Sequence, residues 1–215
     1  MLLGYVSVGE VESHRSFFTD VQAEGILLQE NQNWKGSYFV DLRDKRWPKR
    51  MLEQIIPKVI GQGFNGLFLD TLDNAIELER IDAQKYAGMK SAAAALVRDI
   101  RSRYPALTIM MNRGYELLPE VERDIDMVLG ESVFTSYDFN TCKYQRIPRD
   151  TYLSQVRILK EAQRRRPGLK VFTLDYWNPE DLAEIQRIYR IERSNGFNPY
   201  VATINLDRII PEPKP

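Results

Sequence analysis

Residues Gly61 to Asn74 read Gly-Gln-Gly-Phe-Asn-Gly-Leu-Phe-Leu-Asp-Thr-Leu-Asp-Asn, and this stretch decides the fold. Three glycines lead into the short apolar run 67–69, and two carboxylates, Asp70 and Asp73, stand where the run ends. A continuous apolar run after a helix-like segment is typical of a strand buried on both faces, as in parallel sheets. Ligand sites in such sheets lie at the carboxyl ends of the strands, so we expect chemistry near Asp70.

Similar apolar runs alternate with helical patterns along the rest of the chain. The expected strands are 3–9, 38–40, 67–69, 107–111, 127–129, 171–174 and 200–204. The expected helices are 52–60, 82–103, 117–123, 149–165 and 179–194. Residues 16–36 show no sustained period. Residues 132–148 are too long for a plain turn between strand and helix, so we interpret them as a binding loop.

This alternation of strands and helices predicts parallel β/α packing. The choice lies between an open doubly wound sheet and a TIM-type (β/α)8 barrel. Nearly every strand ends in polar or charged residues, which favours the barrel, because all its strands share one active-site face. The count falls short of eight, and the chain begins inside a strand. We therefore expect one α/β barrel domain over 1–208 that lacks its first one or two strands, with a proline-rich tail at 209–215.

Composition excludes several classes of protein. The chain has 215 residues, of which 43% are hydrophobic, enough for a proper core. Lys plus Arg and Asp plus Glu both number 30, so no net charge favours a nucleic-acid partner. Cys142 is the only cysteine and His14 is the only histidine, which excludes a structural zinc site and a disulfide within the chain. We expect no metal, no cofactor and no insertion into a membrane.

The polar residues at the strand ends are rich in carboxylates. They are Glu10, Glu12, Asp41, Asp70, Asp73, Asn112, Glu131, Asp175 and Asn205. Aromatic residues accompany them, among them Tyr5, Tyr137 and Tyr176. Paired carboxyl groups with aromatic faces for sugar rings are typical of glycoside hydrolysis. One carboxyl must be protonated and another ionised, and crowding of like charges separates their pKa values.

Other interpretations of these residues stay open. Taken alone, Asp70 is better explained as a helix cap, and Asp41 and Asp73 are better explained as capping or supporting residues than as catalysts. Glutamate is a poor cap, so Glu131 is harder to explain in that way. A magnesium site of Asp70, Asp73 and Glu131 ranks lower, because no phosphate-binding glycine loop accompanies it. A carbohydrate-binding module without turnover, belonging to a polysaccharide export system, is a further alternative.

A set of motifs in a fixed order resembles family-114 glycoside hydrolases, the endo-α-1,4-galactosaminidases. The motifs are residues 4–15, the Trp34 loop with Tyr38-Phe39-Val40-Asp41, Trp47, residues 63–70 with Asp73, Asn112 with Gly114, and Gly130-Glu131. The resemblance implies a β/α barrel and cleavage of a cationic, partially deacetylated galactosaminoglycan exopolysaccharide. It also implies a periplasmic or secreted location, and further domains are expected if the parent chain is longer.

By the same resemblance, Asp70 and Glu131 fall on the catalytic carboxylates. We expect Asp70 to be the nucleophile and Glu131 the acid/base, with retention of configuration, although the roles can be exchanged. The residues expected to contact the sugar are Glu10, Glu12, Asp41, Asp73, Asn112, Tyr137, Asp175 and Tyr176. The excess of carboxylates then has a purpose, because it attracts the ammonium groups of the polymer.

Overall fold

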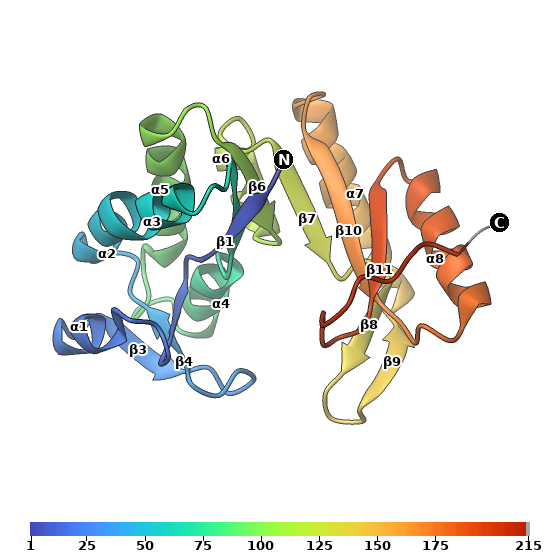
Figure 1. Ribbon diagram of the computed structural model, residues 1–215, viewed down its shortest axis with the longest axis horizontal. Helices are drawn as coiled ribbons and strands as arrows, with labels where there is room; N and C mark the ends of the chain where they lie inside the picture. The colour runs from blue at the N-terminus through green and yellow to red at the C-terminus, as the bar shows by residue number, and fades with distance from the viewer. Residues whose placement is uncertain (214–215) are drawn as a thin grey trace. The chain divides into compact units, whose positions relative to one another are not determined.

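The computed structural model describes residues 1–213 (Figure 1), and the chain divides into two compact units. The first unit is Met1–Asp126 and the second begins at Met127. Each unit contains three parallel strands with helices packed against them, together with shorter antiparallel strands. The predicted α/β class with a mostly parallel sheet is therefore confirmed.

The parallel strands of the first unit are β1 (Leu3–Ser7), β5 (Gly66–Asp70) and β6 (Thr108–Asn112). Side chains alternate between the two faces of a strand. Val6, Leu69 and Met111 fall on one face and are almost completely buried. The opposite face carries the polar ends of the same strands, so alternation separates the core from the candidate chemistry.

Helices cover the apolar face. They are α2 (Arg46–Arg50), the π-helical turn η1 (Met51–Ile55), α3 (Ile56–Gly61), α4 (Asp73–Ile81), α5 (Met89–Arg103), the 3-10 turn η2 (Tyr115–Leu117) and α6 (Leu118–Val121). Trp47 in α2 is completely buried, and its Nε1 donates to the carbonyl oxygen of Val8 at 2.8 Å. A Cβ atom on Gly4 would lie 2.1 Å from Cγ1 of Val59, so α3 approaches the backbone of β1 closely.

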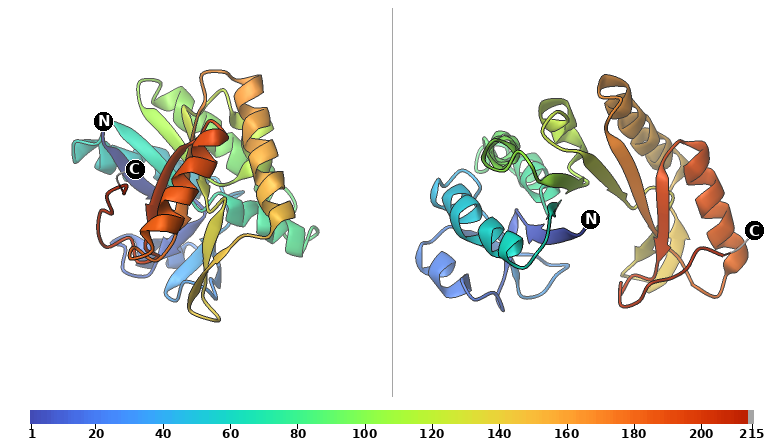
Figure 2. Two further views of the ribbon diagram at one scale, coloured as in Figure 1. Left: turned by 90° about the vertical axis from the view of Figure 1, so that its right-hand side faces the viewer. Right: turned by 45° about the horizontal axis from the view of Figure 1, so that its top comes forward.

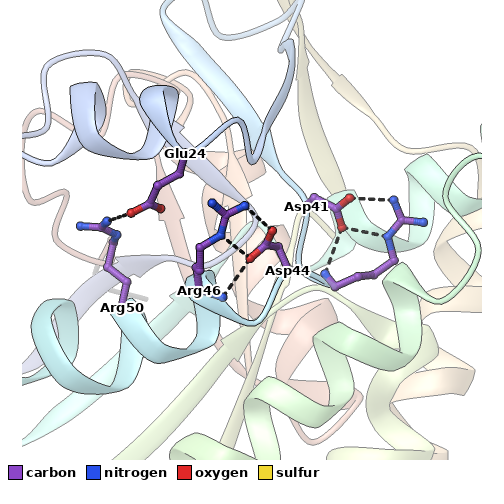
Figure 3. Close-up of polar contacts among 6 residues, drawn as sticks. Glu24, Asp41, Asp44, Arg46 and Arg50 are labelled. Carbon is purple, nitrogen blue, oxygen red and sulfur yellow. Dashed lines mark hydrogen bonds and ion pairs between the residues drawn. The ribbon is translucent and has the colours of Figure 1, made fainter.

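A small antiparallel sheet contains the predicted strand 38–40 together with a strand inside residues 16–36, for which the sequence predicted no regular structure. Its order is β2 (Glu10–Glu12), β4 (Ser37–Val40) and β3 (Leu27–Glu30), and α1 (Phe18–Ala23) precedes β3. Arg50 of α2 bonds Glu24 at the end of α1 at 2.5 Å (Figure 3). These elements are too short to produce a readable period, and tertiary contacts define them.

The second unit contains the parallel strands β7 (Met127–Glu131), β10 (Lys170–Tyr176) and β11 (Asn198–Ala202). Helix α7 (Arg149–Arg165) runs along β10, and α8 (Leu182–Ser194) runs along β11 (Figure 2). Ile185, Ile188 and Tyr189 of α8 pack with Val201 of β11 to form a core cluster. The helix over 149–165 matches its prediction.

Two predicted segments need correction. Residues 132–148 are not a plain loop, because β8 (Thr135–Asp138) and β9 (Lys143–Arg146) pair as an antiparallel hairpin. The predicted helix 82–103 begins only at Met89, because Oδ1 of Asp82 accepts the amides of Gln84 and Lys85 and starts a turn that ends at Gly88. Among the described residues, none of the helices is long and apolar enough to cross a membrane.

Candidate active site

Asp70 ends β5 and accepts hydrogen bonds on both carboxylate oxygens. Oδ2 accepts from the hydroxyl of Tyr5 at 2.9 Å. Oδ1 accepts from Nδ2 of Asn112 at 2.9 Å and from the backbone amide of Thr71 at 2.8 Å. Burial, and then the negative charge of Asp70, raise the pKa of the Tyr5 hydroxyl, so Tyr5 stays a donor. Three donors thus fix the orientation of the carboxylate.

Strand register explains why these side chains meet. Tyr5 pairs with Phe68, and Phe68 pairs with Met110. Asp70 and Asn112 follow two residues after Phe68 and Met110, so all five share one face of the parallel sheet. The ring of Tyr5 also stacks on Phe68 with centroids 6.1 Å apart. Parallel pairing therefore delivers donors from β1 and β6 to the carboxylate at the end of β5.

Glu10 is 6% exposed and joins three segments of the first unit. Its Oε1 accepts from Nδ2 of Asn31 at 2.7 Å and from Nδ2 of Asn74 at 2.5 Å, and its Oε2 accepts from the hydroxyl of Ser37. These partners come from the end of β3, from α4 and from β4. In this arrangement Glu10 links the antiparallel sheet to the helix that follows Asp70.

Glu12 and Asp41 are each held by an arginine a few residues further along. Nε and Nη2 of Arg15 donate to Glu12 at 2.9 and 2.8 Å. Nε and Nη2 of Arg43 donate to Asp41 at 2.8 and 2.7 Å, and Figure 3 shows Asp41 with these bonds. Burial is the largest single influence and raises the pKa of Glu12, but the hydrogen bonds and charge of Arg15, together with a backbone hydrogen bond, lower the pKa overall. Arg43 lowers the pKa of Asp41 by the same kind of contact. Both groups therefore carry a charge that is already partly balanced.

Asp73 begins α4, where a negative charge is favourable beside the helix N-terminus. Its Oδ2 lies 3.2 Å from Nε of Arg113. Arg113 directly follows Asn112 and has a positive φ of 53°. The charge of Asp73 is thus shared between a helix end and a guanidinium.

Glu131 ends β7 in the second unit, and its Oε1 accepts a hydrogen bond from the hydroxyl of Tyr176 on β10. Glu131 pairs with Leu174 in the parallel register, and Tyr176 lies two residues further along the same strand. Glu131 and Tyr176 therefore share one face of this sheet. Tyr176 is 5% exposed, so the bond is sheltered from water.

Asp175 lies on the opposite face of β10 from Tyr176, because the two are neighbours in one strand. It is 0% exposed, and its Oδ1 accepts the amides of Phe134 and Thr135 at 2.8 and 2.7 Å. Burial raises the pKa of Asp175 to about 6. This geometry places Asp175 as the anchor of the segment that leads from β7 into the hairpin.

Tyr137 lies on the β8–β9 hairpin within a group of aromatic rings. Its ring meets Phe139 and Tyr144 edge to face, with centroids 5.3 and 5.2 Å apart. Tyr144 in turn lies 6.3 Å from Trp177. Phe139 is 59% exposed, so the group presents aromatic surface to solvent close in sequence to Glu131.

Comparisons with known proteins place this chain in a family. Residues 1–213 match glycoside-hydrolase family GH114. The chain belongs to that family. An uncharacterised protein of Deinococcus radiodurans is 28% identical over 97% of this chain, and one of Thermotoga maritima is 24% identical over 95%. The chain spans 66% of the length of each of these two relatives.

Solved structures agree with the GH114 assignment. The glycoside hydrolase domain of PelA from Pseudomonas aeruginosa superposes with a TM-score of 0.84 at 29% identity, covering 98% of this chain and 81% of that domain. Ega3 of Aspergillus fumigatus, solved as a complex with galactosamine, shares the fold with a TM-score of 0.68 at 16% identity, covering 98% of this chain and 77% of Ega3. The predicted TIM-type barrel class is the fold of these GH114 domains.

Within the GH114 chain, the structure brings together Asp70 and Asn112 in the first unit and Glu131 and Tyr176 in the second. Tyr5 and Thr71 are partners of Asp70 that the sequence did not single out as site residues. The sequence signal that could have identified Tyr5 is the alternation of side chains between the two faces of the strand 3–7. This alternation places the ring of Tyr5 on the same face as the last residue of the strand. Thr71 carries no such signal, because its conformation follows from the fold.

The last feature of the site is whether its side chains are arranged to bind a metal ion. Across residues 1–213 no group of three or more His, Cys, Asp or Glu side chains is arranged to hold a metal ion.

Proposed function

We propose that this chain is an endo-acting glycosidase that cleaves α-1,4-linked galactosamine and N-acetylgalactosamine polymers, with Asp70 as nucleophile and Glu131 as acid/base. Family membership supports glycoside hydrolysis. The observation that carries the assignment of roles is the set of three donors on Asp70. The polymer specificity rests on the resemblance of the sequence motifs to the galactosaminidases.

The donors on Asp70 favour the role of nucleophile. A nucleophilic carboxylate must be ionised and fixed in orientation, and hydrogen bonds donated to its oxygens favour the charged form. Amide donors from Asn112 and Thr71 cannot accept a proton from a protonated carboxyl group. Asp70 is therefore suited to attack and poorly suited to protonate a leaving group.

Glu131 has the partner that an acid/base requires. The hydroxyl of Tyr176 is both a donor and an acceptor, so it can bond Glu131 in either protonation state. In the first step Asp70 bonds to the anomeric carbon while the glycosidic C–O bond breaks and Glu131 gives its proton to the leaving oxygen. In the second step Glu131 takes a proton from water, the water oxygen bonds to the anomeric carbon, and Asp70 is released.

The contacts to the sugar are part of the same proposal. Tyr137 offers aromatic surface, and Glu12, Asp41 and Asp73 offer carboxylates for ammonium groups. Tyr176 is 5% exposed, so we expect it to act through its hydroxyl on Glu131. Each of these three carboxylates already bonds an arginine. A sugar ammonium group must compete with that arginine, so we expect smaller contributions to binding from these three. Glu10 and Asp175 are buried, and we expect them to act by holding the segments that carry the other residues.

Product analysis tests the proposal directly. Wild type, Asp70→Asn and Glu131→Gln are incubated with partially deacetylated α-1,4-galactosaminoglycan, and released oligosaccharides are measured by mass spectrometry. Glu161→Gln, an exposed surface change on α7, is the matched control. We expect oligosaccharides from wild type and the control alone. A wild type that binds the polymer without releasing products would support a binding module, and activity lost with chelator and restored by Mg²⁺ would support a metal-dependent hydrolase.

A further inference from the structure

Thr71, the residue after Asp70, has a backbone conformation that threonine rarely adopts. Its φ is 65°, in the left-handed region that favours glycine. Within residues 1–213 the other non-glycine residues with positive φ are Arg113, Cys142 and Leu206. Thr71 and Arg113 directly follow Asp70 and Asn112, which bond each other. Strained backbone persists only where surrounding contacts hold it, and it gathers at functional sites.

The hydroxyl of Thr71 makes the contacts that hold this conformation. Oγ1 donates to the backbone oxygen of Asp70 at 2.6 Å and accepts the amide of Gly9 at 2.8 Å. It also lies 3.2 Å from the hydroxyl of Ser7 at the end of β1. One hydroxyl thus fastens the end of β5 to the end of β1.

The residue at position 9 shows how close this approach is. A Cβ atom on Gly9 would lie 2.3 Å from the backbone oxygen of Thr71, closer than any real contact. Glycine is therefore required here by the approach of the backbone of Thr71. The neighbouring amide of Val8 also donates to the backbone oxygen of Asp70 at 3.0 Å, so both strand ends are tied at several atoms.

We propose that Thr71 is a positioning residue for Asp70, and that its hydroxyl holds the backbone so that the Thr71 amide points at the attacking carboxylate. This inference rests on the proposed role of Asp70. With the hydroxyl in place, the amide lies 2.8 Å from Oδ1 of Asp70. Without it, the end of β5 relaxes and the carboxylate loses one of its donors. Small displacements of reacting groups lower the rate steeply, by about 10²-fold for 1 Å.

Three variants separate the hydroxyl from the backbone strain. Thr71→Val keeps the shape and loses the hydroxyl, and Thr71→Ser keeps the hydroxyl without the branch. Thr71→Gly loses the hydroxyl but adopts the conformation freely, so it folds even where valine does not. We expect kcat to fall by about 10²-fold in Thr71→Val and Thr71→Gly with KM little changed, and to stay near wild type in Thr71→Ser.

The split between kcat and KM, with rescue by serine, gives a readout that a purely structural role would not produce. Loss of a donor to Asp70 lowers kcat and leaves KM near wild type in Thr71→Val, whereas Thr71→Ser restores kcat. Thr108→Val is the control, because it makes the same substitution at the first residue of β6, the end of that strand away from Asn112. We expect it to keep wild-type kinetics. Wild-type kcat in a folded Thr71→Val, or an equal loss in Thr71→Ser, would overturn the inference. If Asp70→Asn stays active, the proposed function itself fails.

Discussion

Asp70 and Glu131 each end a parallel strand and each bond a tyrosine hydroxyl, yet their surroundings differ in kind. Asp70 accepts from three donors that come from β1, β6 and its own backbone. Glu131 bonds Tyr176, whose hydroxyl both donates and accepts. In the proposed roles, the amide donors on Asp70 suit an ionised carboxylate that attacks, and the hydroxyl beside Glu131 suits proton transfer.

The largest effect is expected when the leaving group of the substrate is changed, because this separates the proposed nucleophile from the proposed acid/base. Glu131→Gln removes the acid, so cleavage of the polymer falls by about 10²- to 10⁴-fold. An aryl oligosaccharide whose phenolate leaves without protonation bypasses this loss in the first step. Asp70→Asn gains nothing from the same substrate, because no nucleophile remains. Initial bursts of phenolate report the result, and rescue of Asp70→Asn alone would reverse the assignment.

Removal of each tyrosine hydroxyl sharpens the comparison further. Tyr5→Phe takes one donor from the ionised Asp70, which is worth about 1.5–3 kcal/mol for a hydrogen bond to a charged group, or roughly 10- to 10²-fold in kcat. Tyr176→Phe removes the hydroxyl that bonds Glu131, so in the proposed acid/base role we expect it to slow cleavage of the polymer more than cleavage of an aryl substrate with a good leaving group. Kinetics of both variants on both substrates provide the measurement. Equal losses on the two substrates for both variants would mean that the two tyrosines act alike.

The second unit also contains a buried acid that titrates far from its ordinary range. Burial, and then the charge of Asp175, raise the pKa of Glu192 on α8 to about 8, although a hydrogen bond from Asn195 opposes the shift. The folded state thus holds this proton more tightly than the unfolded state. The stability it contributes is present at acidic pH and is lost as pH rises from 4.5 to about 8.

We therefore expect the free energy of unfolding to fall by a few kcal/mol over that interval, since each unit of pKa change corresponds to about 1.4 kcal/mol. Glu192→Gln should flatten this dependence, and Glu161→Gln on the exposed surface should not. Denaturant unfolding across pH measures it. A wild-type stability that rises with pH would contradict the assignment.

The smallest effect is expected at the carboxylates already paired with arginine. Asp41→Asn removes a charge that Arg43 partly balances, so KM for the deacetylated polymer should rise only severalfold. Exposed ion pairs contribute about 0–1 kcal/mol, and salt screens them. Initial rates at low and high salt provide the test. An effect of Asp41→Asn as large as that of Tyr5→Phe would mean that Asp41 contacts the reacting sugar.

Local patterns predicted most of the parallel strands and the long helix 149–165. Apolar runs and helical periods depend on near neighbours, so they can be read directly from the sequence. The pattern missed α1 and β3, and it treated the β8–β9 hairpin as a loop. These short elements depend on partners far along the chain, as Glu10 shows by bonding Asn31, Ser37 and Asn74.

The sequence by itself determined that polar residues stand at the ends of β5, β6 and β7, among them Asp70 and Glu131, because a buried apolar run must stop at a polar residue. The sequence alone also carries the motifs that resemble the galactosaminidases, and the match to GH114 supports this resemblance at the level of the family. Only the tertiary structure decided which face each residue occupies and what bonds it. Asp175 and Tyr176 are adjacent in the chain, yet the pleat turns one toward buried backbone amides and the other toward Glu131. Thr71 has a left-handed backbone because the ends of β1 and β5 meet around its hydroxyl, and a meeting of distant segments leaves no local pattern.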